Sequence, residues 1–293
     1  MTYQIIDAKK AEHKILVSCK LLGVSPSGYF AWKKRGCERR RLCRDRVALA
    51  HVRERFSLSG ETYGAPRVWH DLQEDGIGIG RNRIARLMRE NDLKAHQKRR
   101  FKKTTDSEHK GRIAPNLLAQ DFSADGPDQK WAADISFVWT AEGWLYLAIV
   151  LDLFSRRIIG FAMSSRMKKG LAIAALRKAL MIRQPGKGLI HHSDRGSQYA
   201  SDEYQRLLAS NGMVQSMSGK GNCYDNAMVE TVFKTIKSEL VWRYSWQSRF
   251  EAECAIARYI DGFYNPIRRH SALVYQSPIN FEATCKSETL ALH

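Results

Sequence analysis

The pattern of apolar and polar positions changes character at Trp131. Before this residue, apolar side chains recur at helical spacing in 14–35, 65–76 and 81–91, which predicts amphipathic helices. After it, short alternating or continuous apolar runs predict strands, with helical stretches between them. The chain is therefore expected to combine an all-α N-terminal part with an α/β domain.

Residues 14–35 predict two short helices around a tight turn. Gly23 is expected to end the first helix and Ser25 to cap the second, which begins at Pro26. This is the helix-turn-helix pattern, whose second helix can lie against DNA. The alternative is a small helical hairpin with no role in DNA binding. The side chains expected to pack the pair are Leu21, Leu22, Val24, Tyr29 and Trp32.

A second helical pair is predicted at 65–76 and 81–91. An apolar stripe on 81–91 is expected to face the core, which leaves much of the remaining helix surface to arginines. These arginines form either a solvated face or a contact surface for phosphates, and the neighbouring basic run 96–103 favours phosphates. The candidates for DNA binding in this region are Arg81, Arg83, Arg86, Arg89, Arg99 and Arg100.

Beyond Trp131 the runs predict five strands. The segment 131–139 alternates, with Asp134 facing away from the aromatic side chains, whereas 143–155 is almost continuously apolar, as in a strand buried on both faces. The order of three strands followed by helix, strand, helix, strand and helix describes a mixed sheet flanked by helices. The other strands are expected at 156–164, 188–194 and 213–218, and the helices at 171–183, 201–212, from about residue 226, and at 250–265.

The domain organisation follows from the same patterns and from a stretch with few large apolar residues and many charges, which is interpreted as a linker. We expect five parts along the chain. They are a helix-turn-helix-like region at 1–50, a second helix-turn-helix-like domain at 51–96, a basic linker at 97–125, an α/β core with a C-terminal helix at 126–285, and a tail at 286–293.

Charge is distributed unevenly over the 293 residues, whose formal net charge is +18. Residues 1–112 hold 27 Lys or Arg against 13 Asp or Glu, whereas residues 113–293 hold 21 against 17. An excess this large and one-sided favours a nucleic acid as partner over the weaker alternative, an anionic membrane surface.

Nothing in the sequence predicts secretion or membrane insertion. The first 14 residues lack the apolar core of a signal peptide, and the longest apolar run, 145–151, is far too short to span a bilayer. The six cysteines show no CxxC pairing, so they are interpreted as reduced thiols, neither a zinc site nor a disulfide frame. We expect a cytoplasmic protein.

Three carboxylates are the strongest candidates for chemistry. Asp134 lies inside an apolar strand, where a charge is costly unless it is paired or bound to a metal. Fifty-nine residues separate it from Asp194, and thirty-five separate Asp194 from Glu230. Asp194 alone could be a turn or capping residue. Three acids gathered from distant segments, however, form a site for two divalent metal ions, which cleaves and joins phosphodiester bonds.

Two lysines follow Glu230 on the same helical face. Lys234 and Lys237 stand at the i+4 and i+7 positions. Taken alone, Glu230 and Lys234 are best interpreted as an ordinary surface ion pair of small stability value. Beside two further acids, both lysines become candidates for DNA binding.

Further polar residues are candidates for support of the site. His192 and Asn226 are the two candidates, although for His192 a hydrogen-bonded structural role is an equal alternative. Asp225 is a rival fourth acid, but its position directly before a helix favours an N-cap role. The polar segment 218–226 predicts a mobile loop over the site.

The segments WAADISFV, HHSDRGSQY and CYDNAMVETVFKTIK resemble the DDE core of bacterial insertion-sequence transposases. Within that group the chain resembles the catalytic OrfB protein of insertion sequence family three, whose core is similar to retroviral integrases. YGAPRVWHDL, PNLLAQDF and YNPIRRHSAL extend the resemblance over nearly the whole chain. The resemblance implies an α/β RNase H-like (integrase) core with a mixed five-stranded sheet, preceded by all-α helix-turn-helix units.

The same resemblance implies an activity. Asp134, Asp194 and Glu230 would hold two Mg²⁺ ions, with Mn²⁺ as a substitute, and Lys237 would contact a phosphate of the bound DNA end. The implied reaction is DNA strand cleavage at the ends of the insertion sequence and transfer of the 3′-OH into target DNA. The implied partners are double-stranded DNA, further copies of the chain on that DNA, and the OrfA protein of an upstream frame, either separate or fused. The implied location is the bacterial nucleoid.

Two other functions are compatible with parts of the pattern. A catalytically inactive DNA-binding regulator would use the helix-turn-helix units, but such a protein has no need of three separated carboxylates. A ribonuclease H acting on RNA–DNA hybrids would use the same acids, but its activity does not account for the basic N-terminal region or for the motifs near the end of the chain.

Overall fold

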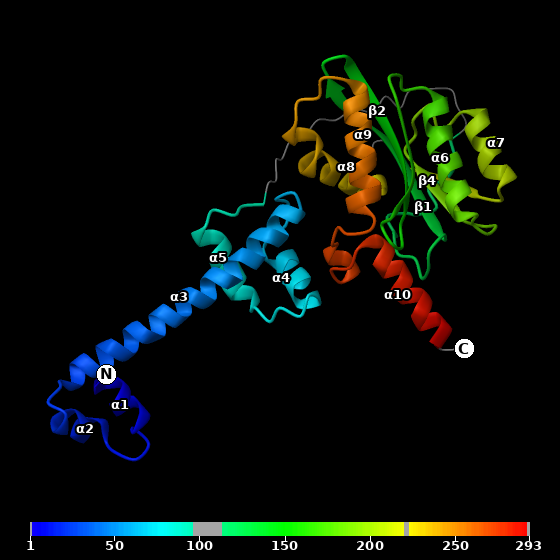
Figure 1. Cartoon of the computed structure of the whole chain (residues 1–293). Coiled ribbons are helices and arrows are strands. Elements are labelled where there is room, and N and C mark those ends of the chain that lie inside the picture. Colours follow the sequence, from blue (N-terminus) through cyan, green and yellow to red (C-terminus); the bar gives the residue numbers. More distant parts are fainter. Residues whose placement is uncertain (1, 96–112, 220–222, 292–293) are drawn as a thin grey trace. The chain divides into compact units, whose positions relative to one another are not determined.

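The computed structural model describes residues 2–95, 113–219 and 223–291. It forms two compact units, Met1–Ala95 and His96–His293 (Figure 1). Two of the DNA-binding candidates, Arg99 and Arg100, lie outside the described residues.

The first unit begins with three helices, α1 (Thr2–Ala8), α2 (Ile15–Leu21) and α3 (Pro26–Leu58). The predicted turn between α2 and α3 is confirmed. Gly23 takes a positive φ of 66° after α2, and the hydroxyl of Ser25 accepts a hydrogen bond from the Gly28 N–H at 3.0 Å. This cap, with a proline at the first helical position, starts α3 where the sequence predicts it.

Two expectations for this region are wrong. The helix that begins at Pro26 is a continuous 33-residue α3, so the predicted boundary between residues 50 and 51 falls inside it. Its polar stretch is rich in arginine, a good helix former, and needs no core contact to remain helical. Leu21 and Leu22 are exposed, because α1, which was not predicted, contributes Ile6 to a small core with Cys19 and Tyr29.

The second helical pair agrees with its prediction. It consists of α4 (Ala65–Glu74) and α5 (Arg81–Glu90), which pack against each other and against α3. The expected stripe is buried, and apolar side chains of α3 and α4 complete the contact. The buried residues are Val52, Phe56, Val68, Leu72, Ile84, Leu87 and Met88.

The second unit is built on one mixed five-stranded sheet, as predicted. Its strands are β1 (Lys130–Thr140), β2 (Gly143–Asp152), β3 (Ile158–Ser164), β4 (Ile190–Ser193) and β5 (Val214–Met217), in the order β3-β2-β1-β4-β5. The first three strands pair antiparallel, whereas β4 pairs parallel to β1 and β5 pairs parallel to β4. The parallel pairs are made possible by helical crossovers between these strands.

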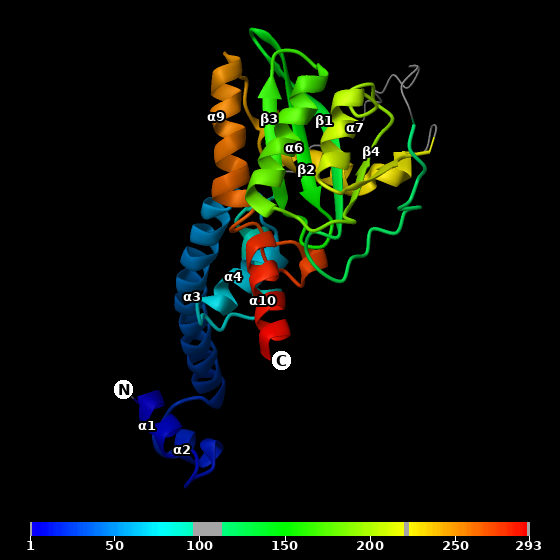
Figure 2. The same ribbon diagram turned by 90° about the vertical axis from the view of Figure 1, so that its right-hand side faces the viewer.

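Helices cover both faces of this sheet (Figures 1 and 2). On one face lie α6 (Lys169–Arg183) and α7 (Asp202–Ser210), and on the other lie α8 (Ala227–Glu239) and α9 (Arg249–Tyr259). Short helical turns occupy Cys223–Asn226, Val241–Arg243, Ile260–Tyr264 and Ser271–Leu273. None of the helices in the described ranges combines the length and apolar composition that a membrane crossing requires.

The close packing of α6 on the sheet depends on one glycine. A side chain at Gly160 on β3 would collide with the backbone of Ala175 and Ala179 on α6. Glycine therefore allows the helix backbone to approach the strand directly.

The described part of the predicted linker belongs to the second unit. Leu118 is buried in the core beneath α8 and α9, and the Pro115 carbonyl accepts a hydrogen bond from the Met217 N–H at 3.3 Å. The Leu117 N–H donates to the Ser216 hydroxyl at 2.9 Å. Residues 113–125 thus pack along β5, although their composition resembles a linker.

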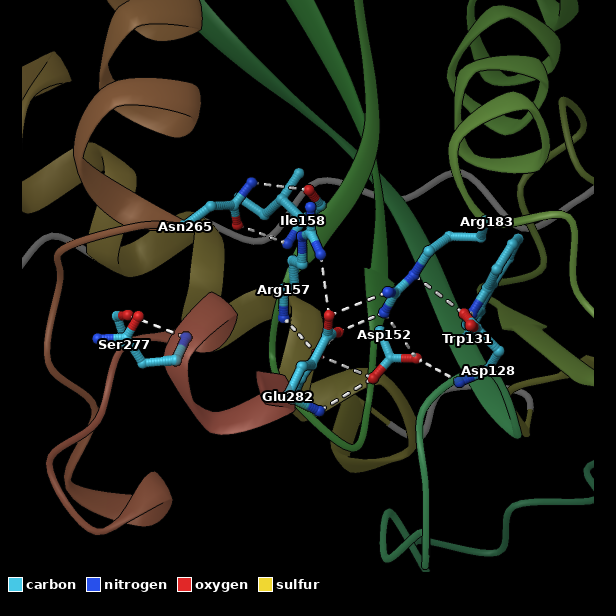
Figure 3. Close-up of polar contacts among 11 residues, drawn as sticks. Asp128, Trp131, Asp152, Arg157, Ile158, Arg183, Asn265, Ser277 and Glu282 are labelled. Carbon is cyan, nitrogen blue, oxygen red and sulfur yellow. Dashed lines mark hydrogen bonds and ion pairs between the residues drawn. The ribbon is translucent and has the colours of Figure 1, made fainter. Parts of the chain in front are cut away.

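A further helix, α10 (Pro278–Ala291), was not predicted and crosses the expected boundary between core and tail. Its Glu282 is buried in a polar network with β2, β3 and α6 (Figure 3). The Glu282 carboxylate accepts hydrogen bonds from Ser155 Oγ at 2.6 Å, from Arg157 at 2.9 Å and from Arg183 at 2.9 Å. This network fixes α10 to the sheet.

We predict that Glu282→Ala lowers the free energy of unfolding by about 3–5 kcal/mol, because it leaves the buried charge of Arg183 without its main partner. Urea denaturation of the full chain measures this. Thr284→Ala, at an exposed position of the same helix, is the control and should change stability by less than about 0.5 kcal/mol. Equal stability of both variants would show that the network does not anchor the helix.

Candidate active site

The register of β1 and β4 brings the two aspartates together. In this parallel pair, Ala133 lies opposite Ser193. Asp134 continues β1 and Asp194 directly follows β4, so both lie one residue beyond the last pair that joins these two strands. Neighbouring strands are about 4.8 Å apart. The residues that precede the acids thus determine that the two carboxylates are neighbours.

Helix α8 adds the third acid. The side-chain amide of Asn226, directly before α8, donates to the Ala133 carbonyl at 3.5 Å and places the start of the helix beside β1. Glu230 follows four residues later, on the same side of the helix. Its predicted pairing with Lys234 is present as a 3.7 Å contact, with the two side chains 39% and 60% exposed.

The electrostatics show that the three acids interact. Burial raises the pKa of Asp134 well above its usual value, and the charges of Asp194 and Glu230 raise it further. Two influences oppose this rise, a hydrogen bond from the Ile135 N–H at 2.7 Å and the positive charge of Lys237. Burial and both neighbouring acids therefore disfavour the ionised form of Asp134 when no cation is near.

Other buried carboxylates of the unit have structural partners. Glu239 accepts hydrogen bonds from Arg268 at 2.6 and 2.8 Å and from the Tyr259 hydroxyl at 2.7 Å. Asp152 accepts from the N–H groups of Asp128 and Ser155 at 2.8 and 2.9 Å. Asp134 differs from them because neighbouring acids, and not only burial, raise its pKa.

The donor set fits a divalent cation. Carboxylate oxygens are the ligands that Mg²⁺ prefers, and a bound cation favours the ionised form of neighbouring carboxyl groups. Within the described ranges, no three acidic, histidine or cysteine side chains are close enough together to hold one ion as they stand. The acids are therefore close neighbours that do not form a closed cage.

Lys237 lies beside the acids. Its Nζ is 4.9 Å from the centroid of the Phe137 ring, in a cation–π contact. Burial lowers the pKa of Lys237, and the charge of Asp134 opposes this effect. The side chain is thus held next to the carboxylates, whereas Lys234 is largely exposed.

The surroundings of His192 agree with the alternative interpretation, a hydrogen-bonded structural histidine. Its ring is fully buried, with Nδ1 2.9 Å from the Ser216 hydroxyl and Nε2 3.2 Å from the Ser218 hydroxyl. Burial lowers the pKa of His192 to about 4, so the ring is neutral near pH 7. Because both ring nitrogens already have partners, the histidine ties β4 to β5.

The expectation that Asp225 caps α8 is wrong. Its carboxylate accepts hydrogen bonds from the Gly219 N–H at 2.7 Å and from the Asn116 amide at 2.9 Å. The residue lies in the helical turn Cys223–Asn226, where it closes the loop after β5. Of the predicted mobile loop, residues 220–222 lie outside the described residues.

One residue near the acids was missed by the sequence analysis. Tyr199 is only 2% exposed, and its hydroxyl has no hydrogen-bond partner in the described part of the chain. Burial raises its pKa well above the usual value, and the charges of Tyr204, Asp134 and Asp194 add to this. Its hydroxyl is therefore a buried donor close to two of the carboxylates. A tyrosine five residues after an acid gives no signal of this in the sequence.

The arginines of α5 fall into two pairs. Arg83 and Arg86 donate to the carboxylate of Asp45 on α3, each at 2.7 Å, and Arg86 also contacts Glu90 at 2.8 Å. Arg81 and Arg89 are exposed. Arg83 and Arg86 thus join α5 to α3, whereas the side chains of Arg81 and Arg89 lie at the surface.

Comparison with known protein families finds separate matches for the helical N-terminal region and for the region that contains the sheet. Models described as integrase core domain match residues 124–223 and 211–278, and a model described as HTH-like domain matches residues 43–101. The first two cover most of the sheet and α8, and the third covers the helices α4 and α5 with the end of α3.

Similar proteins include transposase InsF for insertion sequence IS3A of Escherichia coli (strain K12). It is 40% identical over 287 residues, which cover 96% of this chain and 98% of that protein. A 31 kDa protein of insertion element IS600 from Shigella sonnei, itself uncharacterized, is 45% identical over 270 residues, 90% of this chain and 96% of that protein. Among solved structures, the HTLV-2 integrase catalytic core domain in complex with magnesium is 16% identical, with a TM-score of 0.44, and the match covers 55% of this chain and 99% of that one.

We predict that Tyr199→Phe leaves the free energy of unfolding unchanged or raises it by about 1 kcal/mol, because it removes a buried hydroxyl without a partner. The matched variant Tyr204→Phe removes a hydroxyl that lies 3.1 Å from Nε2 of His191 and should lower stability by about 1–3 kcal/mol. Urea denaturation without metal compares the two. A Tyr199→Phe variant as unstable as Tyr204→Phe would mean that the Tyr199 hydroxyl is hydrogen-bonded.

Proposed function

This chain belongs to the transposase family of insertion sequence IS3, and we propose that it cleaves DNA strands at the ends of an insertion sequence and transfers the resulting 3′-OH to target DNA. The observation that supports the proposal is the strand register that puts Asp134 beside Asp194, with Glu230 near enough for its charge to raise the pKa of Asp134, which burial already raises. Carboxyl groups perturbed in this way cluster at functional sites.

The residues that would hold the metal are the same three acids. Their ligand chemistry fits Mg²⁺, with Mn²⁺ as a substitute, and two ions would share the three carboxylates. When bound, the cations would supply positive charge to the attacking and leaving oxygens of a phosphodiester. Asn226 would support the site through the Ala133 carbonyl, because that contact keeps Glu230 beside β1.

In the cleavage step, the oxygen of a water molecule bonds to phosphorus, the bond from phosphorus to the 3′ oxygen breaks, and a 3′-OH is released. In the joining step, this 3′-OH attacks a phosphate of the target, whose own 3′ oxygen leaves. Lys237 would contact a phosphate next to the reacting bond, since its ammonium is held by Phe137 close to Asp134. Lys234, more exposed, would contact the DNA farther out.

The first unit would bind DNA through its basic surface. Arg81 and Arg89 are exposed on α5, whereas Arg83 and Arg86 are engaged with Asp45. We therefore assign phosphate contacts to Arg81 and Arg89 first. Arg83 and Arg86 would support these contacts by fixing α5 on α3.

Partner chains are part of the same proposal. Apolar side chains of the first unit are exposed on α2, among them Leu16, Val17 and Leu21, at 66%, 52% and 80%. Exposed apolar side chains of this kind are typical of protein contacts. They support assembly on DNA with further copies of the chain or with the OrfA protein of an upstream frame.

The direct test replaces each acid in turn. Asp134→Ala, Asp194→Ala and Glu230→Ala should each reduce Mg²⁺-dependent cleavage and joining at least a hundredfold, since even residues behind metal ligands contribute about 10- to 100-fold. DNA affinity measured in EDTA should be retained. Mg²⁺ should raise the melting temperature of the wild-type chain and of the surface control Asp202→Asn, but not of the three variants.

Other outcomes of that test identify the alternatives. A wild-type chain that binds DNA but neither cleaves it nor gains stability from Mg²⁺ would be an inactive regulator. Cleavage of RNA–DNA hybrids without cleavage of DNA would make it a ribonuclease H.

A second prediction concerns α5. The double variant Arg81→Ala/Arg89→Ala should weaken DNA binding and reduce the slope of log affinity against log salt by roughly 2, about 0.9 for each lost phosphate contact, with an unchanged urea midpoint. Arg86→Ala should lower the urea midpoint, because Asp45 loses a hydrogen bond. An unchanged salt slope in the double variant would place the phosphate contacts elsewhere.

A further inference from the structure

An aromatic face on the β1–β2 hairpin extends away from the acid site. It consists of Phe137, Trp139 and Trp144. Trp139 is 59% exposed and Trp144 is 43% exposed. The Trp144 ring contacts the other two edge to face, with centroids 4.9 Å from Phe137 and 4.8 Å from Trp139. Two tryptophans this exposed at adjacent positions are unusual on a protein surface unless they contact a partner.

The pairing of the strands explains why these rings share one side. Trp139 and Trp144 are direct partners in the antiparallel register, and Phe137 lies two residues away on the same face of β1. The pairing of β4 with β1 ends at Ala133. Beyond that point, among the described strands, β1 pairs with β2 alone, and the pairing of β2 with β3 ends at Tyr146, so the two indoles stand on a two-stranded end of the sheet.

The hairpin is held in place from its turn. Arg249, at the start of α9, donates from its backbone N–H to the Glu142 carboxylate at 2.9 Å and from Nε to the Trp144 carbonyl at 3.1 Å. The Ala141 N–H donates to the Trp246 carbonyl at 2.9 Å. The two indoles are therefore presented on a fixed support, which reduces the entropy lost when a partner binds.

The aromatic face lies on the side of β1 opposite the Asp134 side chain, and Lys237 links the two around the edge of β1 that β4 leaves unpaired beyond Ala133. Lys237 lies over the Phe137 ring at 4.9 Å, and it is close enough to Asp134 for that charge to act on it. Along β1, Trp139 is five residues from Asp134, or about 17 Å at about 3.4 Å per residue. A strand of DNA with a phosphate at the acids, following Lys237 around this edge of β1, would reach the indoles within a few nucleotides.

We propose that Trp139 and Trp144, with Phe137 supporting the Trp144 ring, stack against unpaired bases at the DNA end that is being processed. Aromatic side chains beside a basic residue are the usual platform for single-stranded nucleic acid. In an intact duplex the base faces are hidden in the stack, so a partner for these rings must be unpaired. A DNA end supplies unpaired bases near the reacting phosphate, whereas an uninterrupted target duplex does not. The inference rests on the proposed function, because the acid site determines where that end lies.

The test compares two DNA probes without metal, so that no cleavage takes place. One is a blunt duplex, and the other has the same paired length with three unpaired nucleotides at its end, including a 2-aminopurine. The wild-type full chain should bind the second probe roughly 5- to 150-fold more tightly, the range expected for one stacked base. The 2-aminopurine fluorescence should fall on binding, as it does when the base stacks.

Variants separate stacking from simple apolar contact. Trp139→Leu and Trp144→Leu should lose the preference for the unpaired probe and the fluorescence change, and should keep the affinity for the blunt duplex. Trp139→Tyr should retain most of the preference. Phe250→Ala, which removes an aromatic ring that is 73% exposed on α9, is the control and should behave as the wild type.

Several results would overturn the inference. Equal binding of both probes by the wild type would exclude a platform for unpaired bases while leaving the proposed function intact. Failure to bind either probe would instead count against the proposed function itself. A change of oligomeric state in Trp139→Leu, measured by sedimentation with DNA affinities unaltered, would identify the face as a contact between protein chains.

Discussion

The cost of burying charge is the constraint on which the second unit depends. An ionised side chain in the core needs a partner of opposite charge or several hydrogen bonds. Glu239 has Arg268, and Glu282 has Arg183 with Arg157 and Ser155. These pairs connect segments far apart in the sequence, so neutralisation of charge also determines where the C-terminal helix lies.

The same constraint makes the acid site recognisable. Around Asp134 the chain gathers two more carboxylates, and their charges add to the effect of burial. Repulsion among like charges reduces the stability of the metal-free protein, and a cation that binds there relieves it. His192 on β4 is neutral and does not compensate these charges, because its ring is buried and its nitrogens lie beside serine hydroxyls.

In the first unit, formal charge overstates the surface available to DNA. Arg83 and Arg86 are paired with Asp45, and Arg55 contacts Asp75 at 2.6 Å. Such pairs stabilise the helices around α3. The part of the basic excess that remains exposed is the part that can attract phosphates, so individual contacts matter more than the total.

The sequence by itself determined the elements whose patterns are local. Alternation and continuous apolar runs located all five strands, the stripe on 81–91 located α5, and Ser25 with Pro26 located the start of α3. It also indicated Asp134 as a candidate site residue, because a charge inside so apolar a strand is costly wherever the strand lies. Resemblance to a family then grouped Asp134 with Asp194 and Glu230, and the structure brings the three within electrostatic reach of one another.

Only the tertiary structure decided what depends on contacts between distant segments. Two of the four arginines of α5 are paired because Asp45 on α3 lies beside them. Glu282 holds in place a helix that no local pattern predicted. The Tyr199 hydroxyl lacks a hydrogen-bond partner in the described part of the chain because of the side chains that distant segments place around it. Trp131 and Trp139 illustrate the reason. Both lie on the same side of β1, yet one is fully buried and the other is 59% exposed, because burial is determined by what covers a face and not by the strand that forms it.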